Sequence, residues 1–206
     1  MDAYNIIVIF VILIFSAIVH EVCHGLVAER FGDDTAREQG RITLNPLPHI
    51  DPFGSILLPL LLLWAGSPIV FGAAKPVPVN FDNLKPRRLG MAMVALAGPL
   101  ANYALAVVFA LIIKLGLSNS IATPILLEAV LINLVLGTFN LVPIPPLDGS
   151  KVLGAVLPER FTYWILSWER WGFVLVLLFL YLGWLEYILL PVIMGFSKLF
   201  GIDFGF

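Results

Sequence analysis

The sequence contains few charged residues. Only 13% of its 206 residues are Asp, Glu, Lys or Arg, whereas 60% are hydrophobic. An ordinary soluble domain carries about 25% charged residues. Charge is absent altogether from 3–19, 52–74, 89–113 and 129–147, and about 20 apolar residues are enough to cross a bilayer as a helix. The composition therefore predicts an integral membrane protein.

Two further absences narrow the class of protein. Lys and Arg (12) do not outnumber Asp and Glu (14), so the net charge is −2 and the basic face that nucleic-acid binding needs is missing. We therefore expect no nucleic-acid partner. Cys23 is the single cysteine, so no internal disulfide can form and a disulfide-stapled secreted scaffold is excluded.

The first apolar run is not a cleaved signal peptide. Its nearest basic residue, Arg30, follows the run instead of preceding it, and no small-residue cleavage site ends it. We expect this run to remain as a membrane helix from about Asn5 to Ala28. Further helices are expected at about Leu89–Lys114 and Thr123–Asn140.

The last apolar segment has two interpretations. It runs from about Trp171 to Ser197, and it is either one span interrupted by Glu186 and Pro191 or two shorter helices. With the helices above, this makes an all-α polytopic membrane protein with a three-helix core. Residues 1–157 would form the core, and 158–206 would add the C-terminal membrane helix or helices to the same domain.

The apolar run at 53–71 differs from the others because proline and glycine interrupt it. The part from Phe53 to Trp64 is only 12 residues or about 18 Å as a helix, and the run meets Pro59, Gly66 and Pro68 before Phe71. We therefore expect a re-entrant hairpin. Prolines at 76 and 78 exclude helix from the following segment, Lys75–Asn80, and favour an extended backbone.

The distribution of basic residues tests the hairpin. If 53–71 re-enters, ten of the twelve Lys and Arg share one face, with Lys114 and Lys198 opposite. If it crosses the membrane, the division becomes seven to five. The positive-inside rule favours the hairpin and assigns the ten-charge face to the cytoplasm.

Three ionisable residues stand inside the first membrane helix. His20 and His24 are four apart, so their imidazoles share one helix face, as two ligands of a tetrahedral zinc do. Glu21 is placed to act as a general base on a zinc-bound water. Ionisable residues at membrane depth are by default functional. His24 lies six residues before Arg30 and His20 lies ten, so a metal bound to them would be about 9–15 Å inside the cytoplasmic end of the helix.

Two histidines leave a hydrolytic zinc one protein ligand short. Asp148 is preferred as the third ligand because it follows the broken end of an apolar helix on the same side as His24, although a helix-capping aspartate is the alternative. His49 and Asp51 remain open, either in the site or as interfacial turn residues. Cys23 is a conceivable ligand, but a small apolar core residue is preferred.

Two motifs carry a family resemblance. His20-Glu-Val-Cys-His24, together with Asn140-Leu-Val-Pro-Ile-Pro-Pro-Leu-Asp148-Gly149, resembles the site-2 protease family of intramembrane zinc metalloproteases. The segment Ala97-Gly-Pro-Leu-Ala-Asn102 is similar to the start of that family's middle core helix. The resemblance implies one zinc held by His20, His24 and Asp148, with Glu21 as catalytic base, in a small form without PDZ or CBS domains.

Asparagines within the apolar helices have different expected roles. Asn102 and Asn133 are interpreted as interhelical hydrogen-bond anchors. By the resemblance, Asn140 lies near the scissile peptide, where its amide could stabilise the oxyanion of a tetrahedral intermediate.

These observations predict a hydrolase that cleaves single-span transmembrane proteins in the bilayer, in a prokaryotic inner membrane and with its site open to the cytoplasm. A helical substrate must first be extended, and an exposed strand edge can hold it. The candidates for that edge are Lys75, Val77, Val79 and Asn80, with a rigid connector as the alternative. A membrane metal transporter or sensor, or a non-catalytic binding protein, remains the alternative function.

Overall fold

The computed structural model describes residues 3–52, 57, 61, 64 and 75–204. Its helices are, in chain order, α1 (Ala3–Arg30), α2 (Thr35–Glu38), the 3-10 turn η1 (Leu47–His49), α4 (Arg87–Lys114), α5 (Ala122–Asn140), α6 (Asp148–Val156), α7 (Glu159–Ser167), the 3-10 turn η3 (Glu169–Trp171), α8 (Gly172–Tyr181) and α9 (Trp184–Phe200). No strand occurs among the described residues. The expected all-α class is confirmed.

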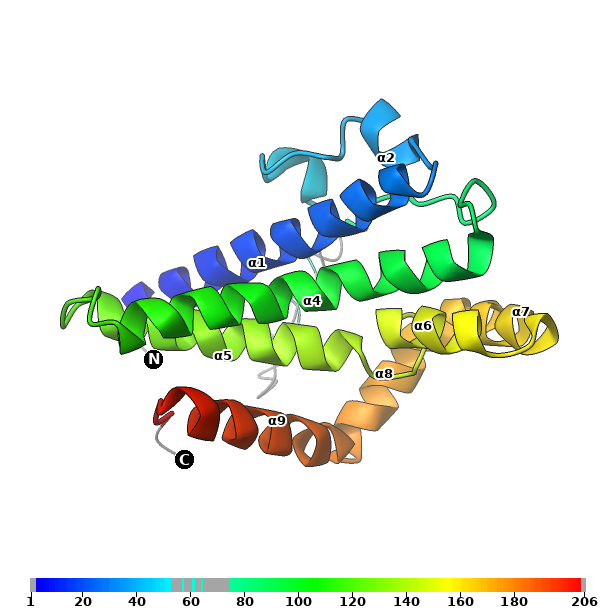
Figure 1. Ribbon diagram of the computed structural model, residues 1–206. Helices are drawn as coiled ribbons and strands as arrows, with labels where there is room; N and C mark the ends of the chain where they lie inside the picture. The colour runs from blue at the N-terminus through cyan, green and yellow to red at the C-terminus, as the bar shows by residue number, and fades with distance from the viewer. Residues whose placement is uncertain (1–2, 53–56, 58–60, 62–63, 65–74, 205–206) are drawn as a thin grey trace.

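Within the part of the chain that the structure describes, three helices are long and apolar enough to cross a membrane: α1, α4 and α5. They match the three expected membrane helices and lie side by side, with α4 between α1 and α5 (Figure 1). Small residues of α4 such as Ala106 and Ala110 are fully buried, which lets the helix backbones approach closely, as helices in lipid require.

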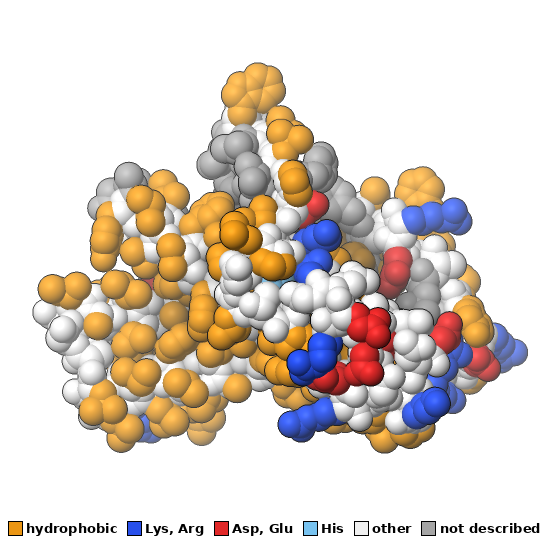
Figure 2. Space-filling model, turned by 90° about the horizontal axis from the view of Figure 1, so that it is seen from above, with side chains coloured by type: hydrophobic (Ala, Val, Ile, Leu, Met, Phe, Trp, Pro, Cys, Tyr) orange, Lys and Arg blue, Asp and Glu red, His pale blue; other side chains and the backbone are white. Residues whose placement is uncertain are grey.

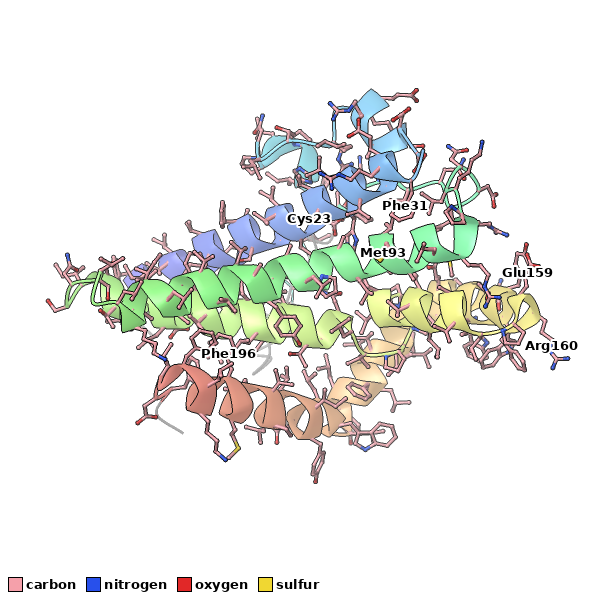
Figure 3. All side chains as sticks on the ribbon, in the orientation of Figure 1. Cys23, Phe31, Met93, Glu159, Arg160 and Phe196 are labelled. Atoms are coloured by element: carbon pink, nitrogen blue, oxygen red, sulfur yellow. The ribbon has the colours of Figure 1, made fainter. Side chains whose placement is uncertain are left out.

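The apolar core joins α4 and α5 to the C-terminal helix α9. Val130 and Leu134 of α5 are completely buried beside Ala106 and Ala110, together with Ile193 of α9. Phe196 of α9 packs against this cluster (Figure 3). This core holds the lower layer of Figure 1 against the three-helix bundle.

The C-terminal apolar segment is two helices, α8 and α9, as one of the two interpretations had it. Glu186 and Pro191, which the one-span interpretation took as interruptions, both lie inside α9. The chain turns instead at Gly183, whose φ of 69° suits a residue without a Cβ.

Residues 148–171, which the sequence interpretation left unassigned, form α6, α7 and η3. The expected hairpin at 53–71 falls outside the described residues, apart from 57, 61 and 64. Residues 75–80 contain no helix, as the prolines predict.

Charged side chains gather at the end of the bundle that carries α2, whereas the opposite end is largely hydrophobic (Figure 2). Arg87 begins α4 and Lys114 ends it, so these two basic residues are about 40 Å apart. The molecule is thus polar at one end, as the uneven distribution of basic residues predicts.

Candidate metal centre

His20 and His24 lie one turn apart on α1, and their Nε2 atoms are 3.0 Å apart. Asp148, the first residue of α6, places its Oδ2 3.1 Å from Nε2 of His20 and 3.2 Å from Nε2 of His24. Each of the three residues is only 7% exposed. The structure therefore brings together two residues of one helix and a third from 124 positions further along the chain.

The three ligand atoms form a nearly equilateral triangle. Zinc bonds of 2.0–2.1 Å imply an edge of about 3.3 Å between ligands in a tetrahedral site, and the observed edges are 3.0–3.2 Å. The triangle therefore has the size of one face of that tetrahedron. A catalytic zinc site leaves the fourth vertex for water.

The remote nitrogens of both imidazoles are engaged. His20 donates its Nδ1–H to Oδ1 of Asn102 at 2.7 Å, and His24 donates its Nδ1–H to the carbonyl of Val94 at 2.6 Å. When both imidazoles are neutral, each Nε2 directs a lone pair toward the other Nε2 and toward Asp148. Two lone pairs and a carboxylate repel one another unless a cation lies between them, so this donor set fits a metal ion.

Asn102 is itself held by a second layer of polar groups. Its amide donates to Oδ1 of Asn133 at 3.0 Å and to the carbonyl of Ser16 at 3.3 Å. Asn133 donates in turn to Oγ of Ser16 at 2.9 Å. All three side chains are completely buried. The two asparagines join α1, α4 and α5 as expected, and Asn102 also orients the His20 imidazole, which the sequence interpretation missed.

Gly98 brings the backbone of α4 directly against the imidazoles. A Cβ at this position would lie 2.4 Å from Nε2 of His24 and 2.5 Å from Nε2 of His20. Carbon and nitrogen atoms in contact are normally about 3.5 Å apart. Only glycine leaves room for the site, and the sequence interpretation did not single out this residue.

Asp148 is placed by a tight turn at the end of α5. Gly149 packs so closely on that turn that an added Cβ would lie 2.1 Å from the carbonyl oxygen of Leu141. Gly149 is therefore required for α6 to begin beside the end of α5, which carries Asp148 toward α1. Lys151 lies 3.6 Å from the other carboxylate oxygen of Asp148.

Glu21 is held by the segment 75–80. Its Oε2 accepts the backbone N–H of Val77 at 2.7 Å. The same segment is bound at its far end, where Asn80 N–H donates to Asp33 at 2.7 Å. Burial tends to raise the pKa of Asp33, but hydrogen bonds from Thr35, Asn80 and Asn83 outweigh it and lower the pKa. Asp33 is thus an ionised anchor at neutral pH.

Some candidates stand apart from the triangle. Among the residues that the structure describes, the one group able to hold a metal is His20, His24 and Asp148. His49 is buried and bonds through Nε2 to the carbonyl of Thr43 at 2.9 Å. Cys23, on α1, is half-buried and is not a member of the group (Figure 3).

The structure also shows the hydrogen bonds of Asn140 and Val77, two residues outside the triangle that were expected to contact the substrate. Asn140, at the end of α5, donates its amide to the carbonyl of Leu136 at 3.0 Å. The N–H of Val77, considered for pairing with substrate, is occupied by Glu21. Its use by a substrate strand would require that bond to be exchanged.

Comparison with known proteins gives consistent matches. The profile described as peptidase family M50 matches residues 116–179. The Bacillus subtilis protein named "Putative zinc metalloprotease YwhC" is 39% identical over 190 residues, covering 88% of this chain and 83% of that protein. Rip2 of Mycolicibacterium smegmatis, named in the same way, is 31% identical over 81% of this chain and 64% of its own length.

A more distant relative is the zinc metalloprotease MJ0392 of Methanocaldococcus jannaschii. It is 26% identical over 76% of this chain, which spans 36% of that longer protein. No solved structure gave a significant match.

Proposed function

This chain belongs to peptidase family M50, the site-2 protease family, and on that premise we propose that it cleaves transmembrane substrates within the bilayer, near the cytoplasmic side. Its class, a zinc metalloprotease with membrane-spanning helices, follows from the relatives and from α1, α4 and α5. The intramembrane substrate, the orientation and the residue roles below are the proposal.

One observation carries the proposal: the triangle of His20 Nε2, His24 Nε2 and Asp148 Oδ2. These three residues would hold one zinc ion. A zinc ion bound there polarises the substrate carbonyl and lowers the pKa of a water molecule in the open position.

The protein's own residues would supply the proton transfers. Glu21 follows His20 on α1, and its carboxylate would accept a proton from the attacking water and deliver it to the leaving amine. The amide of Asn140 would donate to the oxyanion of the tetrahedral intermediate. Burial of the site would exclude bulk water and so strengthen these interactions.

The depth of the site supports a transmembrane substrate. The imidazoles lie on a helix that is apolar on the N-terminal side of His20, and the first basic residue after them is Arg30, in the last turn of that helix. A site at about 9–15 Å from that end would be reached by polypeptide inside the bilayer. By the positive-inside rule the charged end would face the cytoplasm of a prokaryotic inner membrane.

The test is cleavage by the purified protein after reconstitution with a single-span substrate, together with metal analysis. We expect one zinc per chain, cleavage within the membrane-spanning segment, and loss of cleavage on chelation with recovery on adding zinc. A protein that binds zinc but leaves the substrate intact would contradict the proposal and favour a metal-binding role.

A further inference from the structure

Arg41 is the one buried residue among the twelve Lys and Arg, all of which lie within the described residues. It is 6% exposed and follows α2. Burying a cation is costly unless hydrogen-bond acceptors compensate for the lost water. The position of those acceptors therefore indicates what the charge is used for.

The guanidinium of Arg41 is directed at the segment that holds Glu21. Its Nη2 donates to the carbonyl of Lys75 at 2.7 Å and to the carbonyl of Pro76 at 3.2 Å. The carbonyl of Pro76 belongs to the same peptide group as the N–H of Val77, which donates to Glu21 Oε2 at 2.7 Å. A single peptide group thus connects a buried cation to the proposed general base.

The surroundings fix the orientation of that peptide group. Lys75 N–H donates to the carbonyl of His49 at 2.8 Å. The side chain of Val77 is buried beside α1, where a Cβ added to Gly25 would meet it at 3.2 Å. The peptide cannot turn away from Glu21 without breaking these contacts.

Hydrogen bonds arranged in a chain polarise one another, each strengthening the next by about 10–30%. A cation on the carbonyl makes the N–H of the same peptide a better donor. The Pro76–Val77 peptide group lies between the guanidinium of Arg41 and the carboxylate of Glu21. Its N–H donates to one carboxylate oxygen, Oε2. The arrangement orients the carboxylate while Oε1 can receive a proton.

We propose that Arg41 is a positioning residue that acts on Glu21 through the Pro76–Val77 peptide group. The inference rests on the proposed function, because it assigns Glu21 as the base. It predicts that the loss of Arg41 lowers the rate of the chemical step and leaves zinc and substrate binding intact.

The first test is spectroscopic and does not depend on activity. Labelling valine with ¹⁵N and the proline carbonyl with ¹³C selects the three Pro–Val peptides, at 76–77, 78–79 and 191–192. In zinc-loaded protein in detergent, Arg41→Gln should move the Val77 amide proton upfield and speed its exchange, and Glu21→Gln should do the same.

The matched control is Arg37→Gln. Arg37 is exposed, pairs with Glu29 on the surface and lies four residues before Arg41. It should leave the Val77 resonance in place. An unmoved resonance in Arg41→Gln would overturn the inference.

The second test is kinetic. Arg41→Gln should lower kcat about 10- to 100-fold, the cost expected when a catalytic group is misplaced, with KM and one zinc per chain unchanged. Replacing Val77 by α-hydroxyisovaleric acid removes the N–H, keeps the side chain and should lower kcat similarly. Because both changes break one chain of hydrogen bonds, the double variant should be no slower than the slower single variant.

The outcomes separate this inference from the proposed function. Wild-type protein without zinc or cleavage would refute the proposed function itself. Active wild-type protein with an unchanged kcat in Arg41→Gln, or with additive losses in the double variant, would overturn only the role of Arg41. If Arg41→Gln does not fold, the variant with α-hydroxyisovaleric acid at position 77 tests the same chain of hydrogen bonds with Arg41 in place. Its kcat should still fall, and a wild-type kcat in that variant would overturn the inference.

Discussion

The Nδ1 atom of His20 lies 2.7 Å from Oδ1 of Asn102, across the interface between α1 and α4. The contact joins residues 82 positions apart, and both side chains are buried. An amide oxygen there accepts the Nδ1 proton, so the Nε2 lone pair of His20 is free to bind the metal. The proposed centre is thus prepared by a neutral residue that is not itself a ligand.

Asn102→Leu removes that acceptor. We expect zinc affinity to fall about 10- to 100-fold, as for other partners of metal-binding histidines, while the helices remain folded. Asn119→Leu, in the exposed loop before α5, should keep the wild-type affinity. Competition with a chromogenic chelator measures both, and an unchanged affinity in Asn102→Leu would leave the contact without a function.

Glu21→Gln should keep one zinc per chain and abolish cleavage, because it removes the proposed base and no ligand. His20→Ala and His24→Ala should lose both zinc and cleavage. Elemental analysis and a cleavage assay on the same preparations distinguish the two classes. Persistent proteolysis in Glu21→Gln would refute the assigned mechanism.

Asp148→Ala should lower zinc occupancy, because Oδ2 completes the triangle of ligand atoms. His49→Ala should leave occupancy near one per chain, because His49 bonds to Thr43 and is not a member of the triangle. The reverse order in elemental analysis would show that the third ligand is misassigned.

Gly98→Ala should abolish zinc binding, because the new methyl group would lie within 2.5 Å of both Nε2 atoms. The matched control is Gly195→Ala in α9, where nothing lies within 4 Å of the added atom. Zinc content of the two variants provides the comparison. Full occupancy in Gly98→Ala would show that α4 can move away from the imidazoles.

The orientation in the membrane can be tested in a Cys23→Ser background. Cysteines at Gln39 and Lys85, both exposed, should react with an impermeant thiol reagent from the cytoplasmic side. A cysteine at Lys114, at the other end of α4, should react from the opposite side. Reaction of positions 39 and 85 from opposite faces would mean that 53–71 crosses the membrane.

The long helices and the three clustered residues could be predicted because they leave local patterns. Apolar runs define α1, α4 and α5, and the spacing of His20 and His24 shows that they share a helix face. Asp148 was found through its proline-broken helix end and the family resemblance. These signals need no knowledge of how the helices pack.

The residues that the sequence interpretation missed act through packing. Gly98 matters only because α4 passes over the imidazoles, and an isolated glycine in an apolar helix does not reveal that. The bond from Val77 to Glu21 joins residues 56 positions apart. The turn at Gly183 was not located from the sequence, because a proline such as Pro191 inside a membrane helix resembles a break when its neighbours are unknown.

The ligand geometry also has a topological consequence. His24 and Asp148 are 124 positions apart, so an ion bound to both would close a loop of more than half the chain. A covalent crosslink closing a loop of about 100 residues removes on the order of 4–5 kcal/mol of unfolded-state entropy. A bound ion can contribute in the same sense for as long as it remains coordinated. The proposed zinc site would then also crosslink α1 to the second half of the chain and so stabilise the folded protein.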